Sequence, residues 1–199
     1  KTAIIWEGND SKDTLEVSYD QLLVRVSKFA NGLKSIGIEK GDRVCIYMQM
    51  IPELAIAMLA CARIGAVHSI VFGAFSSGSL SDRINDSSCK VLITQDTGVR
   101  GTKLDIPMKS NADQAVASCP SIEHVVVVKR TGTSINMKSP CDIWWDDLVE
   151  NQDSICNPEV MNAEDPLFIL YTSGSTGRPK GVLHTTGGYM VYASYTHKE

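Results

Sequence analysis

Runs in which apolar residues follow one another directly constrain the fold of this chain most strongly. Such runs occur in "HVVVV" (124–128) and "PLFIL" (166–170). A strand with one face in water would alternate apolar and polar residues, so these runs indicate strands that are covered on both faces. Along the chain, predicted strands alternate with segments that have apolar residues at helical spacing. We therefore predict an α/β fold, with a mostly parallel sheet, flanking helices and right-handed crossovers.

Local signals place the individual elements. Ser18 and Gln21 have the spacing of a capping box, and Gly37 ends the helix that follows. Pro52 opens a second helix, which Gly65 ends. The first helix should bury one face made of Leu22, Leu23, Val26, Phe29, Ala30 and Leu33. Strands are expected at 2–7, 15–19, 44–50, 66–72, 90–95, 124–130, 165–172 and 181–186, and helices at 79–87, 110–119 and from 187.

The charge balance excludes several classes of partner. The formal net charge is −4, with 21% charged residues, whereas a general nucleic-acid binder normally carries a basic face. The chain has no polybasic run that would favour a membrane surface. Its longest apolar stretch, 53–67, is shorter than the roughly 20 residues of a membrane span and contains Arg63. We expect a buried helix there, and neither nucleic acid nor a membrane as a partner.

The cysteines and histidines predict no metal or redox site. The six cysteines are widely spaced and form no Cys-x-x-Cys pair. Unpaired thiols of this kind favour a reducing compartment, the cytoplasm or the mitochondrial matrix. None of the four histidines has a second ligand at metal-binding spacing, and of these His184 lies close enough to the loop described next to approach a bound nucleotide. The cysteines are residues 45, 61, 89, 119, 141 and 156, and the histidines are 68, 124, 184 and 197.

The stretch "YTSGSTGRPKGV" (171–182) is the strongest candidate for a binding loop. It follows the predicted strand 165–172, and open α/β sheets bind ligands beyond the carboxyl ends of their strands. Its glycines allow backbone N–H groups to approach a ligand, and its hydroxyls, Arg178 and Lys180 suit a polyphosphate. The spacing is not that of a Walker A loop, because Pro179 precedes Lys180 and Gly181 follows it. A solvated turn between two strands is the alternative interpretation.

This loop resembles the signature loop of the adenylate-forming superfamily, which contains acyl-CoA synthetases, adenylation domains and luciferases. The segments 44–76, 99–109, 142–149 and 164–190 resemble the acetyl-CoA synthetases within it. The likeness covers essentially all of residues 1–199, as the first part of an N-terminal AMP-binding domain. We accordingly expect a piece truncated at both ends that lacks the C-terminal lid domain and is inactive by itself.

The resemblance implies a two-step reaction that uses ATP, Mg²⁺ and coenzyme A. Acetate and ATP would give acetyl-adenylate and pyrophosphate, and coenzyme A would then displace AMP. Propionate or another short-chain acid is an alternative substrate, and a non-catalytic nucleotide-binding module is an alternative function. The phosphate loop would consist of Thr172, Ser173, Gly174, Ser175, Thr176, Gly177 and Lys180. Lys180 would either contribute charge or hold the shape of the loop. No catalytic set is complete within residues 1–199, and no metal ligand is expected.

The resemblance also implies a coenzyme A contact. In acetyl-CoA synthetases an Arg-Gly-Gly-Arg segment contacts the nucleotide end of coenzyme A, and the matching residues here are Arg100, Gly101, Thr102 and Lys103. Lys103 keeps the charge of the second arginine without its planar fork. Phe72 matches a family segment that runs near coenzyme A, although we expect it in the core, and Ala74 replaces a typical glycine there. For Trp144 and Trp145 we expect a Trp packed under the sheet, with Asp146 and Asp147 capping a short helix, and a platform for a sugar or base is the alternative.

Overall fold

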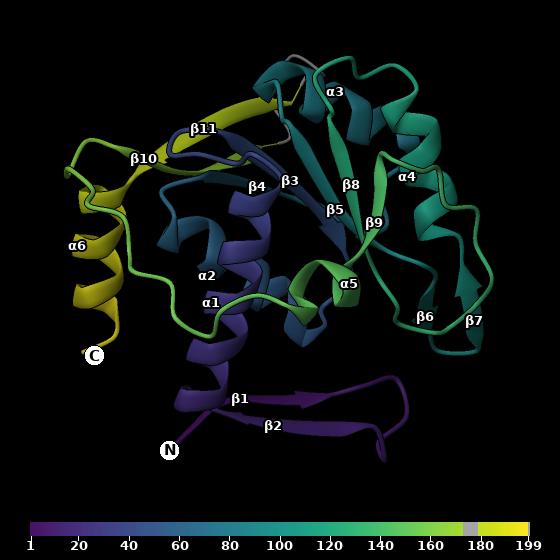
Figure 1. Ribbon diagram of the computed structural model, residues 1–199, viewed down its shortest axis with the longest axis horizontal. Helices are drawn as coiled ribbons and strands as arrows, with labels where there is room; N and C mark the ends of the chain where they lie inside the picture. Colours follow the sequence, from purple (N-terminus) through teal and green to yellow (C-terminus); the bar gives the residue numbers. More distant parts are fainter. Residues whose placement is uncertain (173–178, 199) are drawn as a thin grey trace.

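A computed structural model describes residues 1–172 and 179–198, and these residues form a three-layer α/β structure (Figure 1). Its centre is a seven-stranded sheet in the order β11-β10-β4-β3-β5-β8-β9. All neighbouring strands are parallel except β10 and β11, which are antiparallel. The predicted mostly parallel sheet is therefore confirmed. The strands are β3 (Arg43–Met48), β4 (Val67–Phe72), β5 (Val91–Gln95), β8 (His124–Val128), β9 (Asp142–Trp144), β10 (Pro166–Thr172) and β11 (Lys180–Thr185).

Helices cover both faces of the sheet, as the continuous apolar strands predicted. One face carries α1 (Tyr19–Ser35), α2 (Pro52–Arg63) and α5 (Trp145–Glu150), and the other carries α3 (Ser77–Ser87) and α4 (Met108–Val116). Successive residues of β3 alternate between the two cores: Val44 and Ile46 face α1 and α2, whereas Cys45 and Tyr47 face α3 and α4. A last helix, α6 (Thr186–Thr196), lies at the left edge in Figure 1 and buries no residue.

The helix signals in the sequence are confirmed in detail. Ser18 Oγ accepts a hydrogen bond from the Gln21 amide, and the Gln21 side chain accepts one from the Ser18 amide, so the capping box is complete. Pro52 occupies the first turn of α2. Gly37 and Gly65 follow α1 and α2 with φ of +85° and +71°, which L-residues rarely adopt.

Two expectations about burial and one about helix capping differ from the structure. Leu23 is exposed, because α1 buries only the stripe centred on Val26, Phe29, Ala30 and Leu33. β10 is covered only in part: Phe168 is buried but Leu170 is 43% exposed. Trp145 packs under the sheet and stacks on Phe29, with ring centroids 3.6 Å apart, but no side chain caps α5. Asp146 and Asp147 lie in the first turn of α5, where they favour the helix dipole without capping it.

Two hairpins stand outside the central sheet. One consists of β1 (Thr2–Glu7) and β2 (Thr14–Ser18), and the other of β6 (Gly98–Arg100) and β7 (Lys103–Ile106). The second hairpin was not predicted from the sequence. In Figure 1 the turn of the β1–β2 hairpin points toward the side of the molecule on which β6 and β7 lie.

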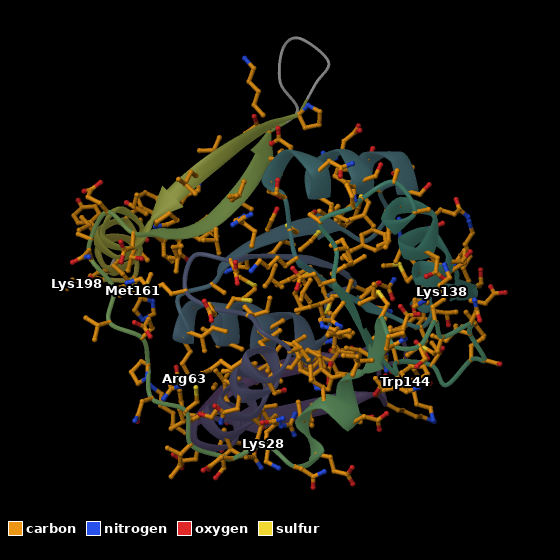
Figure 2. All side chains as sticks on the ribbon, turned by 45° about the horizontal axis from the view of Figure 1, so that its top comes forward. Lys28, Arg63, Lys138, Trp144, Met161 and Lys198 are labelled. Carbon is orange, nitrogen blue, oxygen red and sulfur yellow. The ribbon has the colours of Figure 1, made fainter. Side chains whose placement is uncertain are left out.

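A segment without helix or strand, residues 151–165, connects α5 to β10. Figure 2 shows Trp144 and Met161 at opposite sides of the molecule, with Arg63 between them. The segment is fastened to α2 and to the turn before β3: Arg63 Nε donates to the Cys156 carbonyl at 2.5 Å, and Lys40 forms a 2.9 Å ion pair with Asp165. Within the described residues, no helix has the length and apolar character required to span a membrane.

Candidate coenzyme A cavity and phosphate loop

A cavity of about 450 Å³ opens at the carboxyl edge of the sheet. Its floor is formed by the ends of β3 and β4 and the start of α2, and its walls by the two hairpins. Open α/β sheets bind ligands at this edge, because the loops that follow parallel strands converge there. The described residues that line it include Trp6, Asn9, Gln49, Phe72, Ala74, Arg100 and Arg130.

Phe72 forms part of the apolar side of the cavity. It is 63% exposed, so the expectation that it lies in the core is wrong. As the last residue of β4, it lines the cavity, and its ring also meets that of Phe75 edge-on at 5.9 Å between centroids. The Tyr47 hydroxyl donates to the Phe75 carbonyl at 2.8 Å and so holds this turn against β3. An aromatic face is thereby presented to whatever enters the cavity.

Arg100 reaches the same cavity from the β6–β7 hairpin. Arg100 pairs with Lys103 across the hairpin, while Gly101 and Thr102 form its exposed turn. Of these four residues, only Arg100 lines the cavity. The structure therefore places Arg100 and Phe72 at one cavity, although 27 residues separate them in the sequence, and leaves Lys103 on the exposed side of the turn.

The β1–β2 hairpin supplies a wall that the sequence did not suggest. Trp6 Nε1 donates to the Met50 carbonyl at 2.8 Å. Arg130 forms a 2.8 Å ion pair with Asp13 and lies 4.9 Å above the Trp6 ring. Nothing in residues 2–18 marks them as part of a site, since their role depends on contacts with residues far along the chain.

The candidate phosphate loop lies between β10 and β11. Thr172 and Lys180 face each other at the open end of this antiparallel pair, and both are exposed. The predicted contacts at Ser173, Gly174, Ser175, Thr176 and Gly177 lie outside the described residues. The described geometry thus places the first and last members of the predicted loop next to each other, directly after a strand of the central sheet.

Tyr171, one residue before the end of β10, fastens this strand to α3. Its hydroxyl donates to Asp86 Oδ2 at 2.6 Å. Burial and the Asp86 carboxylate raise the pKa of Tyr171 well above its usual value, so it remains a hydrogen-bond donor at neutral pH. The buried Arg83 guanidinium lies 5.5 Å from the Tyr171 ring and 4.6 Å from the Phe75 ring. Arg83 and Asp86 were not singled out in the sequence, where a helix with mixed charges carries no distinctive pattern.

His184 lies in an aromatic stack on β10 and β11. Its ring is 4.5 Å from that of Phe168, which also contacts His68 at 5.4 Å and Tyr189 at 5.0 Å. The contact between His184 and a nucleotide stays a prediction. Within residues 1–172 and 179–198, no three His, Cys, Asp or Glu side chains gather in a way that could hold a metal ion.

Comparison with known proteins identifies the class. The family model of AMP-binding enzymes matches residues 1–198, so the chain belongs to the AMP-binding enzyme family. Among curated relatives, the chain is 60% identical over 198 residues to an acetyl-coenzyme A synthetase from Nostoc linckia. It is 61% identical over 196 residues to an acetyl-coenzyme A synthetase from Saccharophagus degradans.

A solved structure agrees in fold. The acetoacetyl-CoA synthetase from Streptomyces lividans superposes with a TM-score of 0.87 at 26% identity, over 96% of this chain and 29% of that protein. The alignments span 58% of the Nostoc relative and 30% of the Saccharophagus relative, and 100% and 98% of this chain. The chain therefore corresponds to only part of the length of these relatives.

Proposed function

We propose that this chain is part of an enzyme that activates acetate with ATP and transfers the acetyl group to coenzyme A. An acetate oxygen attacks the α-phosphorus of ATP, the bond to the bridging oxygen breaks, and pyrophosphate leaves. The coenzyme A sulfur, having lost its proton, then attacks the acetyl carbon, and AMP leaves with the oxygen that joined it to the acyl group. Whole-chain identity of about 60% to acetyl-coenzyme A synthetases is the observation that carries this proposal.

Arg100 and Phe72 support a role for the cavity in coenzyme A binding. Coenzyme A combines phosphate groups with a long chain of low polarity, and the cavity combines a guanidinium with an aromatic surface. A guanidinium binds a phosphate through two parallel hydrogen bonds. We assign Arg100 to a phosphate of coenzyme A and Phe72 to the chain that follows it. Gly101, Thr102 and Lys103 would form the outer rim of this contact.

The loop after β10 is assigned to the phosphates of ATP. Thr172 would face the α-phosphate, and Ser173, Gly174, Ser175, Thr176 and Gly177 would hold the pyrophosphate that leaves. Lys180, opposite Thr172 in the register, would add charge or hold the loop. Such a loop acts by positioning phosphates and balancing their charge. Mg²⁺ would enter bound to ATP, and no residue of this chain is assigned to it.

The remaining assignments concern the extent and setting of the protein. Residues 1–199 would be the first part of a larger N-terminal domain, and we expect no acetate activation from these residues alone. Measurable acetate-dependent exchange by the isolated chain would contradict this. The six free cysteines, five of them buried, fit a reducing compartment. We assign the cytoplasm, with the mitochondrial matrix as the alternative.

Acetate-dependent exchange of labelled pyrophosphate into ATP by the full-length protein tests the function. Exchange should require acetate, with propionate as the competing substrate, and should not require coenzyme A. The Ser175→Ala/Thr176→Ala double variant should lower kcat/KM for ATP at least about tenfold, while Ser11→Ala/Thr14→Ala, in the distant hairpin, should not. Absence of exchange with any short-chain carboxylate would overturn the enzymatic proposal. A clear preference for propionate would correct its substrate.

A further inference from the structure

The outer edge of β6 is paired in an unusual way. β6 pairs with β7 through Gly98 and Arg100. In a strand, the N–H and C=O groups of alternate residues point to opposite edges, so those of Val99 point away from β7, where a further strand would ordinarily pair with them. Gly101 lies in the turn that follows β6, with a φ of +59°. The polar backbone groups of Val99 and Gly101 are met by the side chains of Gln49 and Asn9.

Each of these two side-chain amides binds both polar groups of one residue. Gln49 Nε2 donates to the Val99 carbonyl at 3.1 Å, and the Val99 amide donates to Gln49 Oε1 at 2.9 Å. Asn9 Nδ2 donates to the Gly101 carbonyl at 3.0 Å, and the Gly101 amide donates to Asn9 Oδ1 at 2.7 Å. We call these four hydrogen bonds the amide clamp. The two at Val99 supply the pairing that a neighbouring strand would supply, and the two at Gly101 hold the turn.

The clamp joins the hairpin to two separate parts of the fold. Gln49 directly follows β3, and its own backbone amide donates to Oε1 of the fully buried Gln95 at 2.8 Å. Asn9 lies in the turn of the β1–β2 hairpin, 92 residues from Gly101. The approach of Gln49 depends on a glycine, because a Cβ at Gly98 would lie 2.7 Å from Gln49 Oε1.

Arg100 lies between the two clamped residues. Its backbone pairs with Lys103 across the hairpin, and the clamp fixes the residues before and after it, Val99 and Gly101. Its side chain is exposed at the cavity, and the described residues offer its guanidinium neither a hydrogen bond nor an ion pair. A fixed backbone with an uncommitted guanidinium is the arrangement that suits recognition of an anion, since less conformational entropy is lost on binding.

We propose that Asn9 and Gln49 are positioning residues, whose amide clamp fixes the β6–β7 hairpin and thereby places Arg100 for a phosphate of the ligand. The proposal rests on the assignment of coenzyme A to this cavity. It adds two residues that touch no reacting atom and a role for the β1–β2 hairpin.

The first test measures the clamp itself in the full-length protein. Asn9→Ala removes two of the four hydrogen bonds at an exposed position, which limits its effect on folding. Hydrogen–deuterium exchange in peptides that cover residues 98–106, and trypsin cleavage after Arg100 and Lys103, should both become faster by about tenfold. Asn157→Ala, at an exposed asparagine far along the chain, is the matched control and should change neither. Unchanged exchange and cleavage in Asn9→Ala would overturn the clamp.

The second test asks whether the clamp acts on the ligand. Asn9→Ala should raise KM for coenzyme A by about tenfold, while acetate-dependent pyrophosphate exchange, which needs no coenzyme A, stays within twofold. Gly98→Ala keeps the side-chain amides of Asn9 and Gln49, but its new methyl group displaces Gln49. It should also raise KM for coenzyme A and leave pyrophosphate exchange nearly unchanged. A merely structural role would instead lower both activities together.

Arg100→Ala separates this proposal from the functional assignment. If Arg100→Ala raises KM for coenzyme A and Asn9→Ala does not, the cavity assignment holds and the positioning role is wrong. If Arg100→Ala leaves KM for coenzyme A unchanged, Arg100 does not bind that ligand, and the positioning role fails together with that part of the assignment. A faster hairpin exchange in Asn9→Ala would then show a clamp that serves stability alone.

Discussion

His68 is a buried titratable residue without a compensating charge. It lies on β4, and its Nδ1 atom has no hydrogen-bond partner within the described residues. Burial lowers the pKa of His68 to about 4, because the interior penalises the imidazolium form. At neutral pH the ring is therefore uncharged and packs against Phe168 as an aromatic surface.

This residue should make stability depend on pH. The unfolded chain binds a proton at His68 below about pH 6.5, whereas the folded chain does so only near pH 4. Protonation of His68 therefore does not lower the free energy of unfolding above about pH 6.5. As the pH falls to 4, that free energy decreases by about 3 kcal/mol, because the unfolded chain binds the proton and the folded chain resists it. Urea denaturation should show wild type losing that much relative to His68→Leu between pH 7 and pH 4. His197→Leu, at an exposed histidine, is the control, and parallel curves for wild type and His68→Leu would contradict the prediction.

Asp96 organises two loops at the carboxyl edge of the sheet. It is fully buried, and its carboxylate accepts backbone hydrogen bonds from Thr97, Arg130, Thr131 and Gly132, at 2.7 to 3.2 Å. A carboxylate is acceptor-only, which matches a site made of N–H donors.

Asp96→Asn should therefore destabilise the protein strongly. The new NH₂ group would face backbone donors and leave buried N–H groups without an acceptor, at a cost of about 3 kcal/mol. Asp105→Asn, at an exposed position on β7, should change the free energy of unfolding by less than about 0.5 kcal/mol. Chemical denaturation of the two variants measures the difference. Equal effects would show that the carboxylate is not needed to satisfy these loops.

At the scale of elements, two helix ends offer a matched comparison. Gly37 and Gly65 both have positive φ. A Cβ at Gly37 would meet nothing within 4 Å, whereas one at Gly65 would lie 2.9 Å from Lys40 Cγ and Met161 Sδ. Gly37→Ala should cost about 1 kcal/mol, from backbone strain alone. Gly65→Ala should cost at least about twice that, because it also displaces the segment 151–165. Thermal unfolding ranks the stabilities of the two variants. Equal losses of stability would mean that the segment 151–165 can move away from the new methyl group without cost.

Most strands of the central sheet, and the helices that pack on it, could be predicted because their signals are local. The capping box at Ser18, Pro52 at the start of α2 and the apolar run in β8 each act within a few residues. Burial was less predictable, because it depends on neighbours. Leu23 has helical spacing but falls outside the buried stripe, and Leu170 belongs to an apolar strand that the described helices leave partly uncovered.

Residues of the candidate site were predicted only where they belong to a recognisable motif. Arg100 came from a resemblance, and the structure gives it Phe72 as a neighbour at the cavity. The β6–β7 hairpin escaped prediction because its strands, within "GVRGTKLDI", have only three and four residues, too few for their alternation of polar and apolar residues to stand out. Its residues Val99 and Gly101 are bonded by the side chains of Gln49 and Asn9, which are 50 and 92 residues away, and no local pattern reveals such contacts.

At the scale of the whole molecule, the apolar surface is unevenly distributed. The cores on the two faces of β3, β5 and β8 are closed by helices. Around β10, β11 and α6 large apolar side chains remain exposed: Leu170, Val182, Leu183, Tyr189, Met190, Val191, Tyr192 and Tyr195. Such a cluster exceeds the scattered apolar residues of an ordinary surface, and we expect the face that it forms to contact other protein.

We expect the isolated 199-residue chain to associate with itself through this face. The α6 residues Val191, Tyr192 and Tyr195 are about 70% exposed, and a second copy would remove them from water. Sedimentation velocity over a range of concentrations should show dimers or larger species. Val191→Asp should shift the equilibrium toward monomer at least about tenfold, because association would bury a charge. Val160→Asp, at a still more exposed valine in the segment 151–165, should not. Association of equal strength in both variants would place the contact elsewhere, and a monomer at all concentrations would show that α6 needs no partner.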